Sequence, residues 1–302
     1  MTASPRSVFR NDALAGKRVL ITGGGTGLGR GVAGHLVAHG AEVHLWGRRP
    51  AVLEEAAVAA SDGREARVFW QSVDVRDADA VDAAMGALWA DHGPLTSVIN
   101  NAAGNFIAPT ESLSPRAFEA VNGTVMKGSY NTTHSAGRRW IAEGLPGNVL
   151  STLTTWVWTG SAFVVPSAMG KAAVHAMTMS LAVEWARYGI RLNALAPGPI
   201  PTDYAWEMLN PTDTSSIGAT QPDQIPAGRV GTIEELAALT IFLLSDACDY
   251  LTGETIAMDG AQRLAGPGTF AGLTALTAED WNRAREASKA ASEASKAQRG
   301  SA

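Results

Sequence analysis

The sequence predicts a doubly wound α/β fold, in which helices flank a parallel β-sheet on both faces. Short apolar runs, typical of buried strands, alternate repeatedly with longer segments in which apolar residues recur at helical spacing. A glycine-rich stretch at residues 22–29 joins the first strand to the first helix. Repeated strand–helix units build a parallel sheet covered on both sides, and 302 residues with 46% apolar content suffice for one large layered domain.

Each element follows from its own pattern along the chain. The apolar runs that predict strands are residues 17–22, 42–46, 66–73, 97–100, 148–152, 190–196 and 254–258. Helical spacing of apolar residues predicts helices after residue 29 and at residues 51–60, 78–89, 115–141, 166–188 and 233–244. In the helix at residues 78–89, one face should pack on the sheet through Val81, Met85, Leu88 and Trp89.

Two segments depart from this alternation. Residues 197–230 are rich in Pro, Gly, Thr and Asp without periodicity, which predicts a lid or binding loop. We therefore expect residues 1–270 to form one domain that includes this lid. Residues 271–302 have almost no large apolar side chains after Trp281, so a partly helical C-terminal extension with a frayed end is expected.

Composition argues against several functions. The net charge is −5 and no Lys/Arg stripe is present, so no nucleic-acid partner is expected. The chain shows neither a run long enough to cross a membrane nor the pattern of a secretion signal, which predicts a cytoplasmic protein. Cys248, the single cysteine, should be a buried small side chain without a disulfide, and no metal site is predicted.

The glycine-rich loop between the first strand and helix predicts a dinucleotide site. Glycines there let the backbone turn tightly and approach a pyrophosphate, which the amides at the helix N-terminus bind. A structural turn is the alternative, but the placement in the first strand–helix unit favours nucleotide binding. The residues expected to contact the cofactor are Thr22, Gly23, Gly25, Thr26, Gly27 and Leu28.

The end of the second strand indicates which nucleotide binds. NAD-binding chains place Asp or Glu there for the ribose 2′-hydroxyl, whereas this chain has Arg48 and Arg49. Two guanidinium groups suit a 2′-phosphate, so NADPH is the predicted cofactor, with a solvated basic loop as the alternative. Asp74, followed by Val75, is placed to contact the adenine amino group, or else to start the next helix.

Four motifs together resemble the short-chain dehydrogenase/reductase family along residues 16–260. They are TGGGTGLG at residues 22–29, NNAAG at residues 100–104, the lysine Lys171 and PGPI at residues 197–200. Longer stretches resemble the mitochondrial-type 2,4-dienoyl-CoA reductases: NNAAGNFIAPTESLSP, TGSAFVVPSAMGKAAV, VEWARYGIRLNALAPGPI and MDGAQRLAGPGTFAGLTALTAEDW. Those reductases share Ser167, four residues before the lysine, where other members of the family have tyrosine.

The serine limits the chemistry. An alkyl hydroxyl is a poor proton donor near neutral pH, so Ser167 cannot supply the acid that an ordinary ketone reductase needs. The substrate should therefore develop a negative charge that hydrogen bonds hold until water supplies the proton. A conjugated thioester meets this requirement, because its charge spreads to the thioester oxygen.

The resemblance implies further site residues. Lys171 would bind the nicotinamide ribose, and Asn105 would donate its amide to the thioester oxygen. Further cofactor contacts would come from Asn101, Ala102, Pro197, Gly198 and Ile200. Arg76, Phe106 and Ser114 match positions that contact the acyl-CoA, with a surface charge, core packing and a helix N-cap as their respective alternatives.

Three residues depart from the mitochondrial pattern. Trp156 replaces a tyrosine that is the second donor to the thioester oxygen, although an indole N–H can also donate. Lys127 replaces a helix asparagine of many family members and would either lie beside Lys171 with a lowered pKa or extend its head to solvent. Met208 matches an arginine that the mitochondrial enzymes carry in the lid.

The predicted function is reduction of a conjugated fatty acyl-CoA by NADPH, from 2,4-dienoyl-CoA to 3-enoyl-CoA in the oxidation of unsaturated fatty acids. The predicted catalytic residues are Lys171, Asn105, Ser167 and Trp156. Reductases of this type are commonly homotetramers assembled through two long helices, and the same is expected here. Two alternatives stay open: a reductase of the same superfamily for another enoyl or carbonyl substrate, and a non-catalytic NADPH-binding sensor.

Overall fold

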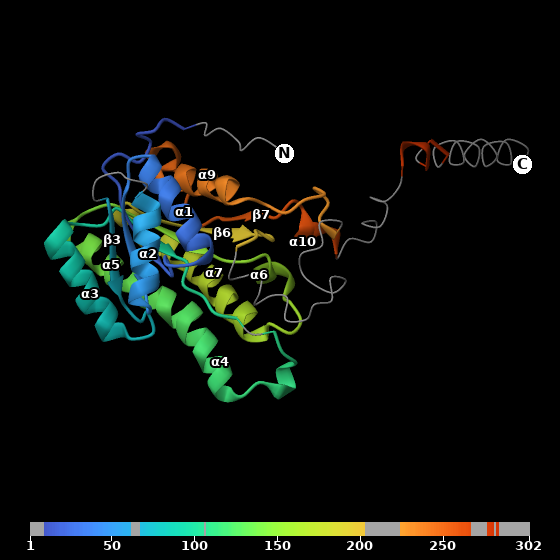
Figure 1. Ribbon diagram of the computed structural model, residues 1–302, viewed down its shortest axis with the longest axis horizontal. Coiled ribbons are helices and arrows are strands. Elements are labelled where there is room, and N and C mark those ends of the chain that lie inside the picture. The colour runs from blue at the N-terminus through green and yellow to red at the C-terminus, as the bar shows by residue number, and fades with distance from the viewer. Residues whose placement is uncertain are drawn as a thin grey trace, which may run out of the picture.

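The computed structural model describes residues 9–61, 67–105, 107–202, 224–266, 277–280 and 282–283. Its centre is a seven-stranded sheet in the order β3-β2-β1-β4-β5-β6-β7, and every neighbouring pair of strands is parallel. Helices cover both faces of this sheet (Figure 1). The doubly wound α/β fold predicted from the sequence is therefore confirmed.

The strands are short, and the central ones are buried, as expected for apolar runs in a parallel sheet. Their bounds are β1 Arg18–Thr22, β2 Glu42–Gly47, β3 Val68–Ser72, β4 Ser97–Asn100, β5 Gly147–Thr152, β6 Ile190–Pro197 and β7 Thr255–Met258. The strand order reverses at β1, because β2 lies on one side of it and β4 on the other. In open α/β sheets, ligands bind at this reversal, beyond the carboxyl ends of the strands.

Two layers of helices enclose the sheet. One face is covered by α1 Gly27–Ala38, α2 Pro50–Ser61 and α9 Ile233–Leu244. The opposite face is covered by α3 Ala78–His92, α5 Gly128–Glu143 and α7 Val165–Trp185. The shorter helical segments are η1 Thr110–Ser112, α4 Pro115–Asn122, η2 Gly123–Lys127, α6 Trp156–Thr159, η3 Ala186–Tyr188, η5 Asp246–Cys248 and α10 Gln262–Ala265.

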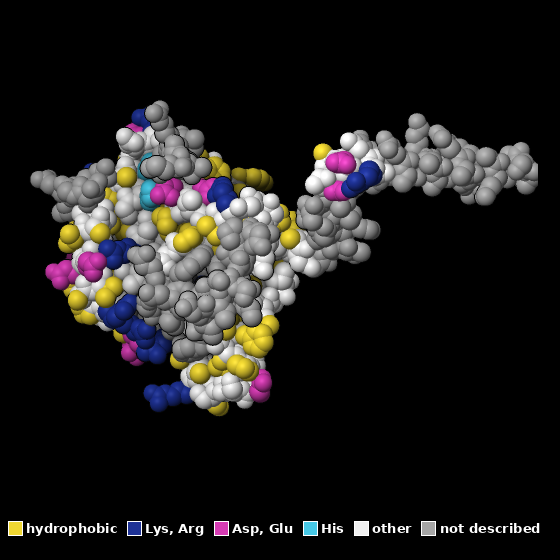
Figure 2. Space-filling view, turned by 45° about the vertical axis from the view of Figure 1, so that its right-hand side comes forward, with side chains coloured by type: hydrophobic (Ala, Val, Ile, Leu, Met, Phe, Trp, Pro, Cys, Tyr) yellow, Lys and Arg dark blue, Asp and Glu magenta, His cyan; other side chains and the backbone are white. Residues whose placement is uncertain are grey.

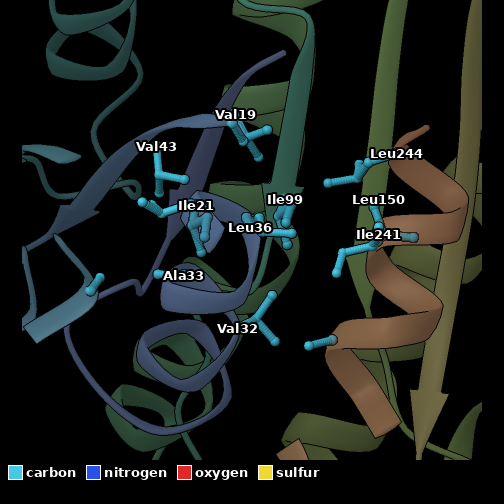
Figure 3. Close-up of a cluster of buried hydrophobic side chains, with 14 of the residues drawn as sticks. Val19, Ile21, Val32, Ala33, Leu36, Val43, Ile99, Leu150, Ile241 and Leu244 are labelled. Carbon is cyan, nitrogen blue, oxygen red and sulfur yellow. The ribbon is translucent and has the colours of Figure 1, made fainter. Parts of the chain in front are cut away.

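The two faces have separate apolar cores. On the first face, Ile21 of β1 points toward Leu36 of α1, and Leu150 of β5 lies beside Ile241 of α9 (Figure 3). On the second face, the fully buried Trp140 donates its indole N–H to the carbonyl oxygen of Leu95 at 2.6 Å. The N–H is thereby satisfied inside an apolar layer, where an unpaired donor would be costly.

The burial of side chains agrees with the apolar pattern. Val81, Met85 and Leu88 are buried on the face of α3 that packs on the sheet. The partly buried Trp89 packs against the same apolar cluster, as predicted. Cys248 is a free, buried cysteine, also as predicted. Burial is the main cause that raises the pKa of its thiol, which makes the sulfur a poor nucleophile.

The helix predicted at residues 115–141 is interrupted by a π-helical turn. α4 and α5 are separated by the π segment η2, which is bounded by glycines at positions 123 and 128. A Cβ atom on Gly128 would lie 2.5 Å from Cγ2 of Val75, so glycine allows this turn to approach the loop after β3. Such single-turn π segments occur often at functional sites.

Only part of the predicted lid and C-terminal extension is described. Residues 203–223 lie outside the described residues, whereas residues 198–202 follow β6 and residues 224–230 lead to α9. In the extension, residues 278–280 and 282–283 are helical. None of the described helices combines the length and apolar character that a membrane span requires. Positive and negative side chains are interspersed on the face drawn in Figure 2, without a continuous basic surface among the described atoms.

Candidate functional site

A cleft with a volume of about 270 Å³ lies where the strand order reverses. It adjoins the carboxyl ends of β1, β2 and β4, the place predicted for a nucleotide. Its lining includes Gly23, Gly25, Thr26, Gly47, Arg48, Arg49, Val73, Asp74, Val75, Ala102 and Ala103. The structure thus brings together three of the predicted cofactor segments, which are far apart in the sequence.

The glycine-rich loop leaves room and hydrogen-bond donors for an anion. Gly23 has a φ of +66°, and a Cβ atom there would lie only 2.9 Å from Cα of Ala102. Thr26 is the extended N-cap of α1, and its side chain makes no capping hydrogen bond. The first amides of α1 and the positive end of the helix dipole can therefore bind a phosphate group.

Thr22 and Asn101 hold this loop against the end of β4. The Thr22 hydroxyl accepts the backbone N–H groups of Asn101 and Ala102, each at 3.1 Å. The side-chain amide of Asn101 donates to the carbonyl oxygens of Thr22 at 3.1 Å and of Gly23 at 3.3 Å. Both polar side chains thus shape the cleft from behind, and their predicted direct contact with the cofactor stays a prediction.

Charged side chains lie at the end of the cleft formed by β2 and β3. Arg48 and Arg49 are exposed and line it together with Asp74. Arg76 Nε donates to Asp74 Oδ1 at 2.9 Å, and this side-chain hydrogen bond is the main cause that lowers the pKa of Asp74. Arg76, predicted as a contact to acyl-CoA, is therefore engaged with a residue predicted to bind the cofactor.

Lys171 is buried on α7, four residues beyond the buried Ser167, so that the two side chains share one helix face. Its ammonium group donates to the carbonyl oxygen of Thr152 at the end of β5. Desolvation lowers the pKa of Lys171 to about 8. Lys127 is exposed, which agrees with the alternative in which its head reaches solvent.

Two candidate donors to a substrate oxygen lie in the segments that follow β4 and β5. Asn105 is partly buried, and its Oδ1 atom has no hydrogen-bond partner in the described part of the chain. Trp156, also partly buried, is the first residue of α6. Phe106 and Met208 lie outside the described residues.

Ser114 is exposed and forms the N-cap of α4, where its hydroxyl accepts the N–H of Ala117 at 3.2 Å. This is the structural role named as the alternative to substrate binding. The predicted contact between Ser114 and acyl-CoA stays a prediction.

The segment after β6 lies beside the glycine-rich loop, and it includes one residue that the sequence analysis missed. Pro197 ends β6, Ile200 is buried, and a Cβ atom on Gly198 would lie 2.8 Å from Cα of Asp259. The Thr202 hydroxyl is buried without a hydrogen-bond partner among the described residues. A Cβ atom on Gly27 would lie 3.7 Å from this hydroxyl, which places Thr202 beside the phosphate-binding loop. A threonine shortly after a cofactor motif was the available signal.

Comparisons with known proteins agree with this geometry. The family model described as enoyl-(acyl carrier protein) reductase matches residues 23–261. A Bacillus subtilis protein named probable 2,4-dienoyl-CoA reductase [(2E)-enoyl-CoA-producing] is 42% identical over 250 residues, which cover 82% of this chain and 97% of that protein. A Caenorhabditis elegans protein named probable 2,4-dienoyl-CoA reductase [(3E)-enoyl-CoA-producing] is 38% identical over 268 residues, with coverage of 88% and 86%.

Solved structures agree as well. A short chain dehydrogenase from Bacillus anthracis has a TM-score of 0.74 at 37% identity, covering 82% of this chain and 96% of that one. A gluconate 5-dehydrogenase from Burkholderia cenocepacia, solved with NADP and tartrate, has a TM-score of 0.75 at 30% identity, with coverage of 83% and 97%. The motifs, the sheet order, the cleft and these similarities lead to one conclusion: the chain belongs to the short-chain dehydrogenase/reductase family of nicotinamide-dependent oxidoreductases.

Proposed function

We propose that this protein is an NADPH-dependent reductase of conjugated fatty acyl-CoA thioesters, converting a 2,4-dienoyl-CoA to a 3-enoyl-CoA. The observation that carries the proposal is the buried Ser167 one helical turn before Lys171. Its hydroxyl stands where a carbonyl reductase of this family needs an acidic tyrosine. The names of the relatives from Bacillus subtilis and Caenorhabditis elegans support the same class of substrate.

The side chains of the site divide the chemistry between binding and charge stabilisation. Bound NADPH supplies hydride. Lys171, with its ammonium group fixed on the Thr152 carbonyl, binds the nicotinamide ribose and contributes positive charge. Asn105 donates its amide to the thioester oxygen, where negative charge develops, as in an oxyanion hole. Water then protonates the dienolate at carbon, so no acidic side chain is required.

The preference for NADPH rests on charge at the end of β2. Arg48 and Arg49 line the cleft where an acid would select NAD, and guanidinium groups bind phosphates well. NADP in the Burkholderia relative is consistent with this cofactor. Replacing both arginines with alanine should weaken NADPH binding and leave NADH binding nearly unchanged. Equal loss for the two cofactors would contradict the proposed role.

Trp156 decides how the second hydrogen bond to the thioester oxygen is made. If the indole N–H is the donor, Trp156→Phe keeps most of the shape and loses about 1–3 kcal/mol of transition-state stabilisation. If the ring only shapes the acyl site, Trp156→Phe is nearly silent. Ser167→Ala should keep substantial activity in both cases, because the serine provides local hydrogen bonding and no proton.

One experiment separates the proposal from its two alternatives. NADPH oxidation is followed with a panel of dienoyl-CoA, enoyl-CoA and ketone substrates of several sizes. Turnover confined to dienoyl-CoA supports the proposal, and turnover confined to another group assigns a different reductase. Tight NADPH binding without oxidation by any dienoyl-CoA would overturn the proposal, and absence of turnover with every substrate of the panel would leave the sensor. Because the relatives are named for both (2E)- and (3E)-products, the position of the remaining double bond is determined in the same assay.

A further inference from the structure

A compact group of potential metal ligands lies at the end of the sheet opposite the nucleotide cleft. Glu42 is the first residue of β2, and His44 follows on the same face of the strand. His92, the last residue of α3, reaches the same place from the covering helix. One side-chain ligand atom from each residue lies within 4.8 Å of the other two. A spacing of 48 residues between the histidines hides this group from any motif search.

We propose that Glu42, His44 and His92 bind a zinc ion that joins β2 to α3. Two imidazoles and one carboxylate are a ligand set that zinc accepts, with water or another small ligand in the fourth position. In a tetrahedral site with bonds of about 2.1 Å, ligand atoms stand about 3.4 Å apart. His44 Nε2 and Glu42 Oε1 are 2.9 Å apart, and all three ligand atoms lie within 4.8 Å of one another, so side-chain rotations that bring these separations to about 3.4 Å would close the site.

The surroundings hold the ligands in place. The Phe69 ring, paired with His44 across β2 and β3, stacks on the His44 ring at 5.1 Å between centroids and packs against His92 at 4.2 Å. The guanidinium group of Arg18 hydrogen-bonds to Glu42 and to the Pro94 carbonyl, which orients the carboxylate. Partners of this kind behind the ligands are typical of metal sites.

The two histidines differ in their present partners. His44 is buried, and its Nε2 atom already faces Glu42 Oε1 at 2.9 Å. His92 is partly buried, and its side chain has two ring contacts but no hydrogen bond within the described part of the chain. A cation bound here would give a ring nitrogen of this half-buried imidazole a partner. The positive charge of Arg18 weakens the site, so micromolar affinity is expected.

Zinc uptake by the full chain, treated with EDTA, dialysed and freed of any histidine tag, tests the proposal. Titration against a chromophoric chelator should reveal one zinc ion per chain with micromolar affinity. His92→Ala and Glu42→Gln should each weaken uptake at least tenfold, whereas His35→Ala, the matched control in α1, should leave it unchanged. Addition of zinc should also raise the melting temperature of the wild type and of His35→Ala, but not that of His92→Ala.

Melting curves without zinc show whether each variant is folded. The His92 side chain contributes only ring contacts to the described structure, so His92→Ala should fold, and Glu42→Gln keeps an acceptor for Arg18. Cobalt provides a second measurement, because the three ligands should give it the intense visible absorption of tetrahedral coordination. Absence of stoichiometric uptake by the wild type, or uptake unchanged in folded His92→Ala and Glu42→Gln, would overturn the site. In that case the three side chains form only a hydrogen-bonded and stacked cluster.

Discussion

Lys171 carries a positive charge inside the protein, and this burial has a measurable cost. Desolvation lowers its pKa to about 8, while the pKa of lysine in an unfolded chain is about 10.4. The folded state therefore disfavours the charged form at neutral pH. A site that holds such a group loses stability for the sake of binding, a trade-off common at functional sites.

The first prediction concerns the pH dependence of this cost. Between about pH 8 and pH 10 the unfolded chain holds a proton that the folded chain has lost, so the stability of the wild type rises with pH. Below pH 8 both states hold the proton, and the desolvation cost is constant. Lys171→Met removes this cost. The free energy of unfolding of Lys171→Met should therefore exceed that of the wild type at pH 7, and this excess should shrink by roughly 3 kcal/mol from pH 7 to above pH 10.

Urea unfolding without cofactor at several pH values measures this difference. Lys127→Met, which replaces an exposed lysine by the same residue, is the matched control. A constant difference between Lys171→Met and the wild type from pH 7 to pH 10 would show that the lysine is not desolvated.

The second prediction concerns Asn105. Its partly buried amide should act on the charge of the transition state, so Asn105→Ala should lower turnover by about 10- to 1000-fold. The KM for NADPH should change little, because the nicotinamide ribose is assigned to Lys171. Steady-state kinetics with the dienoyl-CoA substrate measures both quantities. An unchanged turnover number would remove Asn105 from the mechanism.

At this scale the sequence predicted residues whose chemistry needs a fixed local motif. Gly23, Thr26 and Arg48 line the cleft because the loop that follows each strand can be recognised from its pattern. The ion pair between Arg76 and Asp74 was not foreseen, because two charged residues separated by one position can equally point apart. Thr202 was missed for a related reason: it lies beside the glycine-rich loop only because the whole sheet brings the segment after β6 close to the segment after β1.

At the scale of elements, helix packing depends on glycines where two helices approach closely. A Cβ atom on Gly137 of α5 would lie 2.4 Å from the Trp185 ring of α7, and that indole is buried. A Cβ atom on Gly34 of α1 would have its nearest neighbour, Cα of Ala60, at 3.7 Å. The same substitution should therefore have opposite effects on the two helices.

The third prediction tests this contrast. Gly137→Ala forces a rigid aromatic ring to move and should lower the free energy of unfolding by about 1–3 kcal/mol. Gly34→Ala, with space for the methyl group, should raise it by up to about 1 kcal/mol through helix propensity. Chemical denaturation of both variants measures the difference. Similar effects at the two positions would show that α5 and α7 are less closely packed than described.

Element boundaries followed closely from the sequence where burial determines them. β2 and β6 extend only one residue beyond the predicted runs, because a parallel strand is apolar along its buried length. The π turn η2 was not predicted, since a helical apolar pattern continues across it. It depends on contact between Gly128 and Val75, which belong to segments far apart in the sequence.

At the scale of the whole molecule, η2, α5 and α7 carry large apolar side chains that the single chain leaves in solvent. Met126 and Tyr130, four residues apart, are 37% and 53% exposed, and Met179 and Val183, also four residues apart, are 43% and 83% exposed. Met179 and Val183 share one face of α7. Met126 of η2 precedes Tyr130 of α5, and both η2 and α5 pack against α7. Apolar side chains grouped on neighbouring helices are typical of subunit interfaces.

The fourth prediction is that these helices assemble the chain into a homotetramer, as proposed for reductases of this type. A charge placed at the centre of such an interface must be desolvated without a partner, so Val183→Glu should shift the protein to a smaller species. Val58→Glu is the matched control, because Val58 is 71% exposed on α2, away from α5 and α7. Sedimentation velocity at several protein concentrations distinguishes the outcomes. A tetrameric wild type, a tetrameric Val58→Glu and a dissociated Val183→Glu support assembly through α7. A monomeric wild type, or a Val183→Glu variant with unchanged mass, would mean that these apolar side chains serve another purpose, since a buried unpaired carboxylate at the interface is incompatible with an intact assembly.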